Sequence, residues 1–97
     1  HWQMADLAAA RTLLESLREE TRSVAPRSLL MLLVTQSLAQ VRRDQRDMPA
    51  AQVLFTEGAA LAERLPPSLE LAGFHMIHGL FQRMRGEFEL AEGYLQQ

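Results

Sequence analysis

The chain has 97 residues, 47% of them hydrophobic and 23% charged, which suits one small globular domain. A net charge of −2 argues against nucleic-acid binding through bulk positive charge, and the absence of cysteine excludes disulfides and cysteine-based catalytic or metal sites. The absence of cysteine makes the cytoplasm the expected location. The longest apolar run, Leu29 to Val34, is too short to cross a bilayer, so we expect no membrane segment.

Apolar residues spaced three and four apart predict helices along the chain. The first is expected from an N-cap at Asp6 to about Arg22, with one apolar stripe formed by Leu7, Ala10, Leu14 and Leu17. The second is expected from Pro26, in its first turn, to about Arg43.

A third helix is expected to start at an Asp47 N-cap, with Pro49 in its first turn, and to run through Leu65 until Pro66 and Pro67 stop it. A fourth opens at Ser68 and ends at Gly86, a residue suited to a left-handed C-terminal position. A fifth begins at Phe88. No segment alternates as a strand does, so the predicted fold class is all-α, and the short loops make neighbouring helices antiparallel.

One pattern occurs three times: an acidic residue, a large apolar residue, an alanine and a second large apolar residue. The copies are Asp6, Leu7, Ala10 and Leu14; Asp47, Met48, Ala51 and Phe55; and Glu87, Phe88, Ala91 and Leu95. The alanines are separated by 41 and 40 positions, a spacing typical of stacked helical repeats.

These residues resemble the tetratricopeptide repeat (TPR) family, whose signature has a small residue, a turn glycine, an alanine and then a large apolar residue. The matching positions are Gly79, Gly86, Ala91 and Leu95 in one unit and Ala39, Arg46, Ala51 and Phe55 in the preceding unit, with Arg46 at the glycine position. The resemblance implies a right-handed solenoid fragment of about five helices, in which Ala39 or Gly79 packs closely on Ala51 or Ala91. The units are a half repeat (1–25), a repeat (26–66) and a truncated repeat (67–97). The period exceeds the family's usual ~34 residues, so a HEAT-type stack is the alternative.

No residue set favours catalysis, so we expect no enzyme activity, metal or cofactor. His75 and His78 lie three apart, but zinc needs three or four ligands, and we interpret them as packed between helices. Glu87, Glu89 and Glu92 lie in the first turn of the expected fifth helix, where the helix dipole favours negative charge.

In TPR proteins the first helix of each hairpin lines a concave groove. That resemblance implies a groove formed by Leu33, Gln36, Gln40 and Arg43 in one repeat and by Gly73, Met76, Leu80 and Arg83 in the next. Arg43 and Arg83 would lie on one wall, above a methionine-rich floor. An acidic or apolar peptide would suit such a groove.

We therefore expect a protein-interaction or sensory module, a fragment of a larger bacterial regulatory or signalling protein that binds a protein or peptide segment. One alternative is an all-helical dimerisation domain that self-associates through exposed end helices. The third is a DNA-binding domain using Arg42, Arg43 and Arg46. Nucleic acid is not the expected partner, because Asp44 and Asp47 interrupt this basic run.

Overall fold

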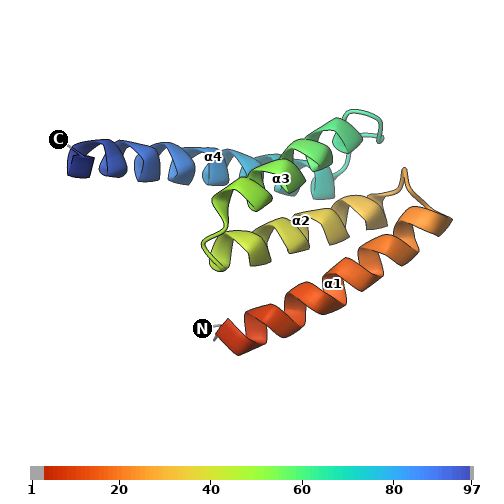
Figure 1. The fold of residues 1–97 in the computed structure, drawn as a ribbon. Coiled ribbons are helices and arrows are strands. Elements are labelled where there is room, and N and C mark those ends of the chain that lie inside the picture. Colours follow the sequence, from red (N-terminus) through yellow and green to blue (C-terminus); the bar gives the residue numbers. More distant parts are fainter. Residues whose placement is uncertain (1–3, 97) are drawn as a thin grey trace. The chain divides into compact units, whose positions relative to one another are not determined.

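The computed structural model describes the backbone of residues 4–96 and the side chains of residues 4–87, 89 and 90. Four α-helices make up this part of the chain: α1 (Met4–Val24), α2 (Leu29–Asp44), α3 (Met48–Ala62) and α4 (Leu69–Gln96) (Figure 1). The described residues contain no strand, which confirms the all-α prediction. None of these helices is long and apolar enough to cross a bilayer. One compact unit ends at Pro67 and a second begins at Ser68.

In the first unit, α2 is the central helix and packs against both α1 and α3 (Figure 1). Short turns connect the three helices, so consecutive helices run antiparallel. Ala39 of α2 and Ala51 of α3 are fully buried. Small residues at such positions allow two helix backbones to approach closely. The most buried large side chains of this unit are Leu32 and Phe55.

The start of α1 differs from the prediction. The helix already includes Met4, so Asp6 is not the N-cap but an acidic residue of the first turn, where the helix dipole favours it. The buried stripe also differs, because Leu17 is exposed and Thr21 is buried in its place. The Thr21 hydroxyl donates to the Leu17 carbonyl at 2.8 Å, which satisfies its hydrogen-bonding need inside the fold.

The N-terminus of α2 is capped by Ser28, and Pro26 lies in the preceding turn rather than in the first helical turn. The Met31 N–H donates to Ser28 Oγ at 3.1 Å. A serine oxygen in this position satisfies a helix N–H that has no partner within the helix. The prediction that Pro26 lies in the first helical turn was wrong, because the helix is capped at Ser28 and begins only at Leu29.

The predicted starts of the two following helices are supported by their capping contacts. The Ala50 N–H donates to Asp47 Oδ1 at 3.2 Å at the start of α3, whose first turn contains Pro49. The Leu71 N–H donates to Ser68 Oγ at 3.2 Å at the start of α4. The predicted end of this third helix, at Leu65, is three residues too late. This helix ends at Ala62, before the residues whose helical conformation Pro66 disfavours.

The end of α2 has the hydrogen bonds of a Schellman motif. The Asp47 N–H donates to the Arg42 carbonyl and the Arg46 N–H to the Arg43 carbonyl, both at 2.9 Å. Arg46 has a φ of 67°, the left-handed conformation that glycine adopts most easily. The structure thus has left-handed backbone at the position that the TPR resemblance assigns to glycine.

The prediction of five helices was wrong, because α4 continues through Gly86 and no separate helix begins at Phe88. No described glycine has a positive φ, so Gly86 does not terminate a helix. Two ion pairs between residues four apart span this position, Arg83 with Glu87 at 3.4 Å and Arg85 with Glu89 at 3.7 Å. Such pairs favour a continuous helix.

The described part of α4 carries apolar residues on two faces. Leu71, Phe74 and Phe81 are buried, whereas Met76 and Leu80 on another face are exposed. Gly79 was expected to face Ala91 across a crossing of two helices, but both residues belong to the continuous helix α4. That expectation was wrong for Gly79. The side chain of Ala91, the other residue of the expected crossing, lies outside the described residues.

Candidate functional site

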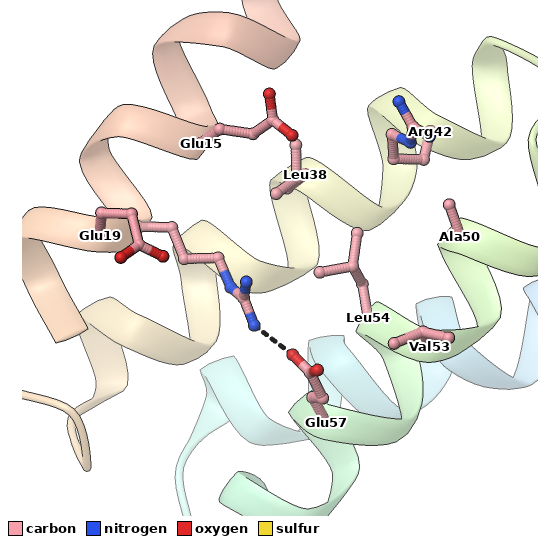
Figure 2. A pocket seen from close by; sticks show the side chains of 9 residues that line it. Glu15, Glu19, Leu38, Arg42, Ala50, Val53, Leu54 and Glu57 are labelled. Carbon is pink, nitrogen blue, oxygen red and sulfur yellow. Dashed lines mark hydrogen bonds and ion pairs between the residues drawn. The ribbon is translucent and has the colours of Figure 1, made fainter.

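The first unit contains a cavity of about 540 Å³ to which all three of its helices contribute (Figure 2). The lining residues are Glu15, Arg18 and Glu19 from α1, Leu38 and Arg42 from α2, and Ala50, Val53, Leu54 and Glu57 from α3. We call this the three-helix cavity. It forms because α1 and α3 both pack on α2, which leaves a hollow between them.

Apolar side chains form one part of the three-helix cavity. Leu38 and Leu54 are buried, whereas Val53 is 56% exposed. The buried leucines belong to the core of the unit, and Val53 extends their apolar surface to solvent. A ligand could cover this surface with apolar groups of its own.

Arg18 connects all three helices of the unit. Its Nε donates to Thr35 Oγ1 on α2 at 3.4 Å. Its Nη2 forms an ion pair with Glu57 on α3, drawn as a dashed line in Figure 2. Thr35 is buried. Because a charged side chain at such a site needs partners, the Thr35 and Glu57 contacts explain how an arginine is accommodated here.

Arg42 is the second guanidinium of the three-helix cavity, and partners at the end of α2 hold it. Its Nη2 forms an ion pair with Asp47, and its Nη1 donates to Gln45 Oε1 at 3.4 Å. Asp47 is also the N-cap of α3, so one carboxylate serves both the helix start and Arg42. The side chains of Arg18 and Arg42 are only 15% and 16% exposed.

The α1 wall of the three-helix cavity carries two more accessible carboxylates. Glu15 forms an ion pair with Arg11 at 3.4 Å and Glu19 with Arg22 at 3.0 Å, and both pairs lie within α1. The two glutamates are 50% and 68% exposed. Exposed pairs of this kind contribute little to stability.

The predicted groove residues of α2 do not lie on the face of this helix that lines the three-helix cavity. Gln40 lies two positions from Leu38, which puts the two residues on nearly opposite sides of the helix. Gln40 and Arg43 together line a second cavity of about 340 Å³ between α1 and α2, whose other lining residues are Leu7, Ala10, Leu14, Ser37, Val41 and Asp44. Leu33 and Gln36 lie on α2 but line neither cavity.

The remaining predicted groove residues belong to α4, in the second unit. Met76 and Leu80 are exposed, as a binding surface requires, and Arg83 forms an ion pair with Glu87. Gly73 is partly exposed, and an added Cβ there would have no described atom within 4 Å. The common wall of Arg43 and Arg83 stays a prediction.

None of the residues lining the three-helix cavity was among the predicted groove residues, and Arg42 was considered only for the DNA-binding alternative. One signal could have indicated part of it, because Arg18 follows Leu14 by four positions and precedes Thr21 by three, on the packed face of α1. A charged residue at such a position requires a partner. That partner, Glu57, could not be identified from the sequence, because it lies 39 positions further along the chain on another helix.

The two histidines predicted to pack between helices lie on α4. The ring centroid of Phe74 is 5.7 Å from that of His78 and 5.6 Å from that of His75. Burial, and secondarily the nearby His75, lowers the pKa of His78 below its ordinary value of 6.5. Among the described residues, no three histidines or carboxylates are arranged to hold a metal ion.

Comparisons of the chain with protein-family models, with curated proteins and with solved structures found no match. The resemblance to TPR proteins therefore depends on the residue pattern alone.

Proposed function

We propose that the chain is a protein-interaction module that binds a peptide segment of another protein in the three-helix cavity. The observation that carries this proposal is the combination of an apolar floor with charged groups from three helices around it. The floor would supply affinity and the charged groups selectivity, which is how helical proteins accept the apolar side of a peptide. In this proposal the chain is a non-catalytic part of a larger bacterial regulatory or signalling protein.

The dimensions of the cavity suit a few side chains of a partner. Its volume of about 540 Å³ lies within the ordinary range for binding pockets. Full burial of a leucine-sized side chain contributes about 1.5–3 kcal/mol, and an anchor on this floor contributes less, because Leu38 and Leu54 are already buried. Val53 is the exposed part of the floor and would be covered first.

The TPR-like arrangement of the fold also belongs to this proposal. It is supported by antiparallel helices, by the burial of Ala39 and Ala51, and by the left-handed backbone of Arg46. A solenoid that uses the face of Gln40 and Arg43 would offer a second binding surface, on the other side of α2. The cysteine-free composition supports a cytoplasmic location.

Selection from a displayed peptide library, followed by titration of the enriched peptides, tests the proposal. Val53→Glu should abolish binding because it places a charge on the apolar floor, and the exposure of Val53 should leave the fold intact. Thr56→Glu is the matched control, since Thr56 is exposed on the same helix and does not line the cavity. Circular dichroism checks that both variants fold.

Two results would contradict the proposal. If the selected peptides bind Val53→Glu as tightly as the parent, the three-helix cavity is not the binding site. If the Arg43→Glu protein no longer binds the selected peptides, the opposite face of α2 is the binding surface, as the TPR resemblance implies.

A further inference from the structure

We infer that the three-helix cavity selects peptide segments in which lysine or arginine flanks the apolar residues. This inference rests on the proposed function and specifies the chemistry of the partner. It depends on which charged groups around the cavity are accessible and which are already engaged. The lining residues include three carboxylates, on Glu15, Glu19 and Glu57, and two guanidinium groups.

The accessible charge of the cavity is negative and lies on its α1 wall. On the α1 wall Glu15 and Glu19 lie one helical turn apart (Figure 2). Glu57 on the α3 wall is 49% exposed, but it already forms an ion pair with Arg18. A peptide lying on the floor at Val53 would therefore have the carboxylates of Glu15 and Glu19 along one side of it. A cationic side chain at that edge of the peptide would have a carboxylate within reach.

The two guanidinium groups offer much less to a ligand. Arg18 is engaged by Thr35 and Glu57, and Arg42 by Gln45 and Asp47. An anionic ligand would have to compete with Glu57 or Asp47 for an arginine that is mostly buried. It would also approach Glu15 and Glu19, which would repel it.

The present partners of the α1 carboxylates are easily exchanged. Arg11 is partly exposed and Arg22 is exposed, and neither lines the cavity. Their ion pairs with Glu15 and Glu19 lie along the surface of one helix. Such pairs contribute little, so a lysine of the partner can replace them at small cost. Once the peptide excludes water from the cavity, the new pairs are screened less than the old ones.

Three synthetic peptides of equal length test the inference. They share one leucine pattern and carry lysine, glutamine or glutamate at the remaining positions. Fluorescence anisotropy should rank their affinities as lysine, then glutamine, then glutamate, and added salt should reduce the lysine preference. The double variant Glu15→Gln, Glu19→Gln should weaken the lysine peptide by roughly three- to tenfold and leave the glutamine peptide unchanged.

The double variant Glu20→Gln, Glu63→Gln is the matched control, because it also removes two exposed carboxylates, neither of which lines the cavity. An equal loss in this control would assign the preference to net charge and overturn the inference. Tightest binding of the glutamate peptide, or a full lysine preference in the double variant, would overturn it as well. Equal binding of all three peptides that Val53→Glu abolishes would overturn the charge preference but support the proposed function. If none of the three binds, neither proposal stands for this cavity.

Discussion

Arg18 on α1 forms an ion pair with Glu57 on α3, 39 residues further along the chain. α1 and α3 both pack on α2, and this pair is a direct link between them across the three-helix cavity (Figure 2). The Arg18 Nε also donates to the buried Thr35 hydroxyl, so one guanidinium fixes all three helices relative to one another.

Replacing Arg18 with methionine should destabilise the fold by about 1–2 kcal/mol, because Thr35 and Glu57 both lose a donor while most of the side-chain volume is kept. Urea denaturation followed by circular dichroism measures the change in the free energy of unfolding. Arg83→Met is the control, and it should change stability by less than about 0.5 kcal/mol because Arg83 is 77% exposed. An Arg18→Met protein as stable as the parent would show that the three-helix link contributes nothing.

Replacing Arg46 with glycine should stabilise the protein by about 0.5–1 kcal/mol. The φ of 67° strains any residue with a Cβ, and the Schellman hydrogen bonds hold the backbone in that conformation. A gain could come from relief of the backbone strain or from loss of the arginine side chain. Arg46→Ala separates these two causes, because it removes the side chain beyond Cβ but keeps the Cβ. If thermal denaturation shows that both variants gain equally, the gain does not come from the backbone.

The positions of the helices could be predicted from the sequence, because apolar spacing and capping residues act locally. Asp47 and Ser68 accept from N–H groups three residues away, and such contacts depend little on the rest of the fold. Gly86 shows the limit of this reasoning. Glycine suits both a helix end and a helix interior, and here the pairs of Arg83 and Arg85 with residues beyond it favour continuation.

The candidate site was harder to predict than the helices. Its lining residues come from three helices, and which of their faces meet depends on how α1 and α3 pack on α2. The TPR resemblance implies binding on the face of Gln40 and Arg43, whereas Leu38 and Arg42 line the three-helix cavity on the other side of the same helix. Periodicity defines the buried face of a helix but not the hollow that neighbouring helices leave beside it.

Replacing Gly86 with alanine should raise the helix content and stabilise α4 by about 1 kcal/mol. Alanine is the better helix former, and an added Cβ would have no described atom within 4 Å. Ala72→Gly is the reverse change at an exposed position of the same helix and should destabilise α4 by a similar amount. If Gly86→Ala is instead destabilising, Gly86 has the left-handed conformation of a helix end in solution.

Stability should decrease as the pH falls below about 6.5, because His78 is held neutral in the fold. Its pKa is lowered by burial and by the charge of His75, whereas in the unfolded chain it returns to 6.5. The contribution of neutral His78 is therefore complete above pH 6.5 and is lost as the pH falls through the lower pKa of the folded state. An NMR titration of the imidazole measures that pKa directly, and His78→Gln should flatten the pH dependence of unfolding. A His78 pKa at or above 6.5 in the folded protein would contradict this prediction.

Replacing Ala51 with leucine should destabilise the protein by about 1–3 kcal/mol. Ala51 is fully buried on α3, the helix that packs against α2, so a larger side chain must displace its neighbours. Ala10 occupies the equivalent repeat position on α1 but is only partly buried, so Ala10→Leu should cost less. Chemical denaturation of both variants gives the two free energies. Equal costs would indicate that α1 packs as tightly at this position as α3 does. An Ala51→Leu protein that unfolds like the parent would show that this alanine does not determine how closely α2 and α3 approach.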